Sequence, residues 1–286
     1  MKTNALYIFG ILLLNLINSR NTLAKPVQNS RSKRFTTSVV KSERDAYGYL
    51  AKYGYNPCEN ESKPNGTNSE TFCRQVALKT MLKDFQAQNG LPKTGTLSAS
   101  VKKLMNTPRC GVRDMPRAFK TAKSWTKTCF TWNLRNGTLP SLGLTKIRQQ
   151  IRQSFQDWAT HSLLTFKEVS ENEKADLYLA FTNQNNDSNF DGPGKTLAYA
   201  SFLTVGEIRF DATEPWTEKY DDDDINLRLV ATHQIGHVLG LGHSYGLLSI
   251  MNPYYLPMRS EDMLPEDDRH DIQALYGPRF PPSSGE

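Results

Sequence analysis

Apolar residues recur at helical spacing in the part of the chain that runs from Arg44 to Leu104. Gly90 and Gly95 interrupt this pattern, because glycine breaks regular structure. The pattern predicts two or three short helices that form a small helical domain ending near Pro108. The apolar positions are Tyr47, Leu50, Tyr53, Val76, Met81, Leu82, Phe85, Leu97, Val101 and Leu104.

After Met115 and Pro116, short strand patterns alternate with helical ones. The predicted strands are Phe130–Trp132, Leu163–Val169, Asp176–Phe181 and Glu207–Phe210. The strongest helical pattern covers residues 144–159, and two further helices are predicted at 226–239 and 265–275. The apolar face of the first of these helices carries Ile147, Ile151, Phe155 and Trp158. Strands interleaved with helices in this order predict an α+β domain.

The N-terminus has the pattern of a secretory signal peptide. Met1 and Lys2 precede an apolar run from Leu6 to Ile17, and small residues up to Ala24 suit a signal peptidase. A membrane anchor is the alternative, but the run of about a dozen residues is shorter than the roughly 20 that span a bilayer. No other segment is apolar enough to cross a membrane. We therefore expect residues 1–24 to be removed and the protein to be secreted.

Four glycosylation sequons agree with export, since they can be used only on a secretory path; they begin at Asn60, Asn65, Asn136 and Asn186. Four cysteines would enter an oxidising compartment. Cys58 and Cys73 flank a loop rich in Gly, Asn and Ser, and we expect a disulfide between them. Cys110 and Cys129 remain, either as free thiols or as a second disulfide.

Charge is spread unevenly along the chain. Residues 1–116 carry a formal net charge of +11 and residues 117–286 one of −5, which give the +6 of the whole chain. A basic N-terminal segment that lies on an acidic domain accounts for this asymmetry. We expect no nucleic-acid binding, because an exported chain rarely meets nucleic acid.

The candidate chemistry is concentrated in three histidines near residue 240. His233 and His237 are four residues apart in a predicted helix, so they project from one face. Gly240 can adopt the positive φ that ends a helix, which lets the chain turn back and bring His243 to the same point. Three imidazoles that leave one position open are the ligands of a catalytic zinc. Histidines without a metal are the alternative, but the chain has only five histidines and three of them have this spacing.

This segment resembles the His-Glu-x-x-His-x-x-Gly-x-x-His motif of the matrix metalloproteinases, which are zinc endopeptidases of the metzincin group. Ser249–Tyr255 is similar to the family's Met-turn, with Met251 as its methionine, and to the adjoining wall of the specificity pocket. Pro108–Asp114 is similar to the family's cysteine switch and departs from it only at Arg113, where proline is usual. The resemblance covers Tyr47 to Tyr276.

The resemblance implies a metzincin catalytic domain, a mixed twisted sheet with three helices, preceded by a small helical pro-domain. The domain order would be a signal peptide (1–24), a pro-segment with the switch (25–116), the catalytic domain (117–280) and a short tail (281–286). We expect a short form without the family's C-terminal propeller, as in its shortest members.

The resemblance also implies latency. Cys110, as a thiolate, would take the fourth position on the zinc and exclude the water that the metal activates. Arg109 and Asp114 match the ion pair that braces this loop in the family, while Arg113 adds flexibility and charge. The enzyme would stay latent until an activating protease removes the pro-segment.

Gln234 stands where the family has its catalytic glutamate. Zinc lowers the pKa of its bound water to about 7, and the glutamate takes the proton during attack and returns it to the leaving amine. An amide can orient the water through a hydrogen bond but has no basic site near neutral pH. A positioned general base contributes roughly 10² to 10⁴ in rate, so we expect strongly attenuated turnover.

For further metal ions the resemblance gives two opposite expectations. We expect no structural zinc, because other residues stand at its ligand positions, which are Gln184, Asn186, Tyr199 and Arg209. We expect a calcium site that mixes carboxylates with backbone carbonyls, with a turn of solvated acids as the alternative. Its ligands would be Asp191, Gly192, Gly194, Thr196, Asp211 and Glu214.

Two functions fit these residues. The first is a secreted zinc endopeptidase that hydrolyses extracellular matrix or other extracellular proteins, with Ala198–Phe202 as the strand that pairs with substrate. The second is a silent pseudoprotease that binds peptides or protein inhibitors of metalloproteinases. Gln234 favours the second function, whereas the zinc ligands, the Met-turn and the cysteine switch favour the first.

Overall fold

The structure is a computed structural model that describes residues 40–57, 69–114, 124–135, 137, 139, 141–201, 205–221, 224–258 and 263–279, with the backbone alone for 69–76. The chain divides by contacts into Met1–Arg34 and Phe35–Glu286, and all described residues belong to the second unit. Several expectations lie outside the described residues. They are the signal peptide 1–24, the tail 281–286, the sequons at Asn60, Asn65 and Asn136, and Cys58 of the expected Cys58–Cys73 disulfide.

The N-terminal helical part contains α2 (Glu43–Lys52), α3 (Ser69–Gln88) and α4 (Ala99–Met105). A capping box begins α2, in which the Ser42 side chain accepts from the Asp45 backbone and the Asp45 side chain accepts from that of Ser42. These helices enclose a hydrophobic cluster of their own, to which Tyr254 from the C-terminal half also belongs. Its largest fully buried side chains are Phe85, Leu50, Met81 and Leu82.

The main sheet has six strands in the order β1-β5-β6-β4-β2-β3. They are β1 (Arg109–Cys110), β2 (Cys129–Arg135), β3 (Thr165–Glu168), β4 (Leu177–Thr182), β5 (Thr196–Ala200) and β6 (Glu207–Asp211). β5 and β6 are antiparallel, and the other neighbouring pairs are parallel. A second, two-stranded sheet joins β7 (Trp216–Thr217) to β8 (Ile225–Asn226). This mixed sheet confirms the predicted α+β class.

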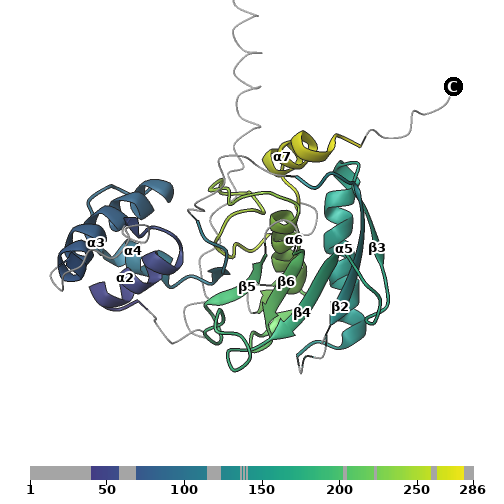
Figure 1. Cartoon of the computed structure of the whole chain (residues 1–286), viewed down its shortest axis with the longest axis horizontal. Helices are drawn as coiled ribbons and strands as arrows, with labels where there is room; N and C mark the ends of the chain where they lie inside the picture. Colours follow the sequence, from purple (N-terminus) through teal and green to yellow (C-terminus); the bar gives the residue numbers. More distant parts are fainter. Residues whose placement is uncertain are drawn as a thin grey trace, which may run out of the picture. The chain divides into compact units, whose positions relative to one another are not determined.

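Helices α5 (Leu144–His161) and α6 (Leu227–Val238) lie along one face of the main sheet, and α7 (Glu266–Tyr276) follows them (Figure 1). The predicted apolar face of α5 is buried, as its spacing indicated. In α6 every residue except Arg228 is buried, so this helix has no broad polar face and lies at the centre of the fold. None of the described helices is long and apolar enough to cross a membrane.

α6 passes its neighbours so closely that Gly236 has no room for a side chain. A Cβ atom at this position would lie 2.4 Å from Sδ of Met251 and 2.9 Å from Cζ2 of Trp158. We expect Gly236→Ala to lower the free energy of unfolding by about 1–3 kcal/mol, as overpacking of a core does, and urea unfolding measures this change. Gly242→Ala is the control, because a Cβ at Gly242 meets nothing within 4 Å. Equal effects of the two substitutions would contradict the packing argument.

Candidate metal centre

α6 carries two histidines one turn apart. His233 Nδ1 lies 2.7 Å from the carbonyl oxygen of Ile250, and His237 Nδ1 lies 2.9 Å from that of Leu241. Because a carbonyl oxygen only accepts hydrogen bonds, each ring carries its proton on Nδ1 and a lone pair on Nε2. The two Nε2 atoms are 3.0 Å apart, so two lone pairs face each other.

The turn after α6 brings a third histidine to the same point. Gly240 has a φ of 107°, and the backbone N–H of Leu241 donates to the carbonyl of Gly236. The side chain of His243 is buried, with Nδ1 3.1 Å from Oδ1 of Asp114. Its Nε2 atom has no hydrogen-bond partner among the described residues.

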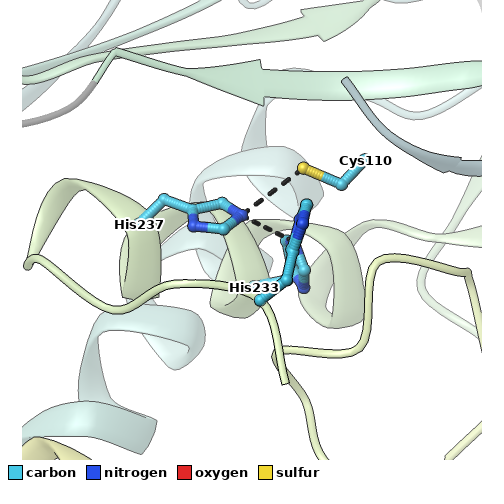
Figure 2. A group of neighbouring side chains, drawn as sticks. Cys110, His233 and His237 are labelled. Atoms are coloured by element: carbon cyan, nitrogen blue, oxygen red, sulfur yellow. Dashed lines mark hydrogen bonds between the residues drawn. The ribbon is translucent and has the colours of Figure 1, made fainter. Parts of the chain in front are cut away.

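Cys110 adds a sulfur to the three imidazoles. Its Sγ lies 3.5 Å from His237 Nε2, and Figure 2 shows the side chains of Cys110, His233 and His237 converging. The ligand atoms of these residues and His243 all lie within 4.8 Å of one another. From ordinary zinc bond lengths, a tetrahedral site places its nitrogens about 3.3 Å apart and a sulfur about 3.6 Å from each nitrogen. The distances from His237 Nε2 to His233 Nε2 and to Sγ of Cys110 are close to these values.

Cys110 and Cys129, which could have formed a second disulfide, are both free thiols. Cys110 is buried among the histidines, whereas Cys129 is exposed at the start of β2. A Cys110–Cys129 disulfide, the alternative that the sequence left open, is therefore wrong. The sulfur of Cys110 remains available as a metal ligand.

A bound cation would remove an electrostatic conflict in this cluster. Two facing lone pairs repel, and burial lowers the pKa of both rings, that of His233 to about 3, so protonation does not relieve the contact. Burial also raises the pKa of Cys110 to about 12, so a thiolate forms here only beside a positive charge. The four residues therefore fit a zinc ion held by three imidazoles and one thiolate.

Gln234 lies beside the sulfur and is fully buried. Its Nε2 donates to Sγ of Cys110 at 3.2 Å and to the carbonyl oxygen of Ala198 at 3.4 Å. The carbonyl sets the orientation of the amide, because a carbonyl oxygen pairs only with the NH₂ group. Oε1 is buried and has no partner among the described residues. The side chain thus directs N–H donors, and no basic group, at the sulfur.

The switch segment, Pro108–Asp114, is held between two walls. On one side Gly111 donates from its backbone to the carbonyl of Ala198, and on the other Cys110 donates to the carbonyl of Pro253, each at 2.8 Å. The expected substrate-pairing strand Ala198–Phe202 overlaps β5, although Phe202 lies outside the described residues. An apolar pocket opens beside the histidines, with a lining that includes Leu197, Leu229, Val230, Leu256 and Met258.

The structure brings Arg109 and Asp114 into a buried ion pair. Although burial opposes ionisation, the Arg109 guanidinium lowers the pKa of Asp114 to about 2. The guanidinium carbon lies 3.6 Å from the ring centroid of Tyr53, and Tyr55 donates its hydroxyl to Asp114 at 3.0 Å. From the sequence, Tyr53 was expected only as an apolar helix position, and no role was predicted for Tyr55. The helical spacing of apolar residues carries no sign that either tyrosine contacts a charged group.

Comparison with known proteins decides the family. The family model described as Matrixin matches residues 124–277. The chain belongs to the matrixins. This membership confirms the resemblance to the matrix metalloproteinases and the metzincin fold.

Several known relatives align with most of this matrixin. Matrix metalloproteinase-19 of Homo sapiens is 38% identical over 246 residues, which cover 82% of this chain and 45% of that protein. Matrix metalloproteinase-2 of Drosophila melanogaster is 30% identical over 277 residues, covering 87% and 35%. Interstitial collagenase of Bos taurus is 34% identical over 279 residues, covering 95% and 56%. The chain spans less than two thirds of the length of each of these relatives.

The segment expected to form the Met-turn contacts His233 through the carbonyl of Ile250 and is held by a buried acid. Met251 is buried, and its carbonyl accepts from the backbone of Ser244 at 3.0 Å. Asp268, from the first turn of α7, accepts from Ser249 Oγ at 2.7 Å and from the backbone of Ile250 at 2.8 Å. From the sequence, Asp268 was expected only as one of the acids at the N-terminus of the last helix, with no role at this site. The sequence did contain one indication of its burial. Ile272 lies four residues later on the same helix face, and both residues are buried.

Two residues of the expected calcium set are buried acids with unused oxygens. Glu214 accepts from the backbone of Gly194 at 2.7 Å through Oε1, while its Oε2 has no hydrogen-bond partner within the described part of the chain. Asp211 is fully buried, and its Oδ2 also has none among the described residues. Buried carboxylate oxygens without partners are costly unless a cation compensates them. Carboxylate and carbonyl oxygens suit calcium, so these residues fit that ion.

A third acid of the expected calcium set, Asp191, faces Lys52. It is exposed, and its Oδ2 lies 3.8 Å from Nζ of Lys52 in α2, which also donates to Thr196 Oγ1 at 2.9 Å. Gly192 has a φ of 87°, so the loop after Asp191 turns sharply. The three carboxylates do not form a cluster as close as that of the histidines. A shared cation would therefore require Asp191 to leave Lys52.

The calcium-free matrixin should lose stability as the pH rises. Burial raises the pKa of Glu214 to about 8, and the nearby Asp211 carboxylate adds to the rise, whereas an unfolded glutamate titrates near about 4.3. A raised folded pKa means that the fold favours the protonated carboxyl, so its contribution is complete below about pH 4 and lost toward about pH 8. We expect the free energy of urea unfolding to fall by roughly 5 kcal/mol across this range.

Two comparisons check this pH dependence. Saturating calcium should flatten the slope, because the ion favours the ionised carboxylate. Glu214→Gln should flatten it without calcium, since an amide does not titrate but can still accept from Gly194. An unchanged slope in Glu214→Gln would show that another group is responsible.

Two of the four residues that stand at the family's structural-zinc ligand positions, Tyr199 and Arg209, form hydrogen bonds with Asp187. Tyr199 donates its hydroxyl to Oδ2 of Asp187 at 2.5 Å, and Arg209 donates to the same oxygen at 3.1 Å. A hydroxyl and a guanidinium thus connect the loop before β5 to β5 and β6. The positive guanidinium of Arg209 makes this corner a poor place for a metal ion.

Proposed function

We propose that this matrixin is a secreted, latent zinc metalloendopeptidase of extracellular proteins, attenuated by Gln234. The observation that supports it most is the buried cluster in which the ligand atoms of Cys110, His233, His237 and His243 all lie within 4.8 Å of one another. In this proposal the three histidines hold the zinc and Cys110 is its fourth ligand in the latent state.

The residues around the cluster suit a peptide substrate once the switch segment leaves. When bound, zinc would supply a polarised water and would polarise the scissile carbonyl. β5 would pair with an extended peptide through backbone groups such as the Ala198 carbonyl, which Gly111 occupies in this structure. The apolar pocket beside His233 would take an apolar side chain. Nε2 of Gln234, which donates toward the position of the sulfur, could donate to a water there and orient it, but an amide cannot take its proton.

The remaining parts of the proposal concern regulation. Residues 25–116 would be the pro-segment, and an activating protease would remove it, releasing Cys110 from the centre. Calcium would stabilise the loop around Glu214 and Asp211. The substrates would be extracellular matrix or other extracellular proteins, and protein inhibitors of metalloproteinases would bind the same cleft.

A silent pseudoprotease that binds peptides or inhibitors is the second candidate. The observation that favours it is the orientation of Gln234, whose Nε2 donates to the sulfur of Cys110, so that an N–H donor stands where a general base would have to accept a proton. Zinc and substrate binding would be the same in both candidates. They differ only in turnover.

Hydrolysis of an internally quenched peptide separates the two candidates. The zinc-loaded chain, freed of its N-terminal segment by limited proteolysis, is compared with His233→Ala treated in the same way, and zinc content is measured in both. Cleavage above the His233→Ala rate supports a weak peptidase. Cleavage at that rate by a protein that holds one zinc supports the pseudoprotease. A chain that binds no zinc contradicts both.

A further inference from the structure

We infer that the fourth position of this metal centre is an anion site, and that Gln234 is the residue that makes it one. Its ligand is the Cys110 thiolate in the latent state and a carboxylate, such as the C-terminus of a peptide, once the switch segment has left. The inference rests on the proposed zinc site but not on its turnover.

The sulfur is placed as an acceptor of hydrogen bonds. Sγ of Cys110 accepts hydrogen bonds from Nε2 of Gln234 at 3.2 Å and from the backbone N–H of Val112 at 3.3 Å. Val112 belongs to the switch segment and leaves with it. Gln234 belongs to α6 and stays, fully buried, with its amide oriented by the Ala198 carbonyl. The open centre therefore keeps one N–H donor directed at the fourth position.

An ionised glutamate at position 234 would weaken anion binding at the fourth position instead of strengthening it. A carboxylate offers only acceptor oxygens and a negative charge, so it repels an anion at hydrogen-bond distance. The repulsion would be strong here because the site is buried and poorly screened. Gln234 replaces this repulsion with a charge-assisted hydrogen bond.

A carboxylate suits such a position better than other simple ligands. One of its oxygens can approach the metal while the other accepts from Nε2 of Gln234. Peptides that end in a carboxylate at this point are the products of hydrolysis, and β5 and Pro253 offer backbone groups to hold them, as they hold the switch segment. The open matrixin would then retain peptide ends that an enzyme with glutamate releases.

The test uses the full chain loaded with cobalt(II), whose visible spectrum reports its fourth ligand. Cys110→Gly removes the sulfur and leaves space, and formate, the smallest carboxylate, is titrated into it. The matched variant is Cys110→Gly/Gln234→Glu. We expect formate to bind at least about 10-fold more tightly when Gln234 is present, as a hydrogen bond to a charged group implies. Formamide, a neutral molecule of the same size, should show no such preference.

Each result has a distinct meaning. Equal formate affinities in the two variants overturn the inference, and so does a preference of the same size for formamide. A cobalt spectrum without tetrahedral character in both variants would instead contradict the proposed zinc site.

A second measurement leaves Cys110 in place. In the metal-loaded full chain, Gln234→Glu should speed the labelling of Cys110 by a maleimide about 10-fold or more, because the thiolate loses a donor and gains a like charge. An unchanged labelling rate in a folded, metal-loaded variant would also overturn the inference.

Discussion

Gln234→Glu should raise peptide hydrolysis by the opened, zinc-loaded matrixin about 10²- to 10⁴-fold. The reason is that Gln234 is fully buried and its Nε2 lies 3.2 Å from Sγ of Cys110, the atom at the proposed fourth ligand position. A carboxylate of the same shape would be held within reach of a metal-bound water and could take its proton during attack. kcat/KM for a quenched peptide, normalised to zinc content, measures the gain.

The control for this prediction is Gln234→Ala, which removes the amide without supplying a base. It should show no gain, and its zinc content should match that of the unmodified chain, because Gln234 is not among the proposed zinc ligands. The gain in Gln234→Glu should lie mainly in kcat, since proton transfer occurs in the transition state. A gain below about 10-fold at equal zinc content would show that something other than the missing base limits turnover.

Local spacing in the sequence was enough to predict the elements that carry the histidines. The four-residue interval between His233 and His237 predicted the helix that became α6, and Gly240 predicted its end. The buried face of α5 also followed from its spacing. Such patterns work because they reflect neighbours within one or two helical turns.

Contacts between distant segments could not be predicted in the same way. Tyr53 packs on Arg109, 56 positions further along the chain, and Lys52 reaches Asp191, and neither pair has a local signature. The calcium set illustrates the limit. The sequence named the acids, but only the structure shows that Asp191 faces Lys52 while Glu214 lies buried with an unused oxygen.

Breaking the buried Arg109–Asp114 pair should destabilise the latent chain and loosen the switch. Asp114→Asn leaves the guanidinium of Arg109 buried without its counter-charge, which typically costs about 3–5 kcal/mol. We expect this loss in the free energy of urea unfolding and faster labelling of Cys110 by a maleimide. The comparison is Lys146→Met, which breaks the exposed pair with Glu218 and should cost less than about 1 kcal/mol.

A double variant separates charge compensation from packing in this switch. Arg109→Met leaves the Asp114 carboxylate buried without its guanidinium counter-charge, so alone it should be about as harmful as Asp114→Asn. Together the two substitutions remove both charges, and the pair should cost clearly less than the sum of the single effects, with a coupling of about 1–3 kcal/mol. Additive effects would mean that the ring of Tyr53 and the hydroxyl of Tyr55, rather than the opposite charge, hold each partner in place. Coupled effects would show that the latent state depends on bringing both charges into the core together, so that removing either one opens it.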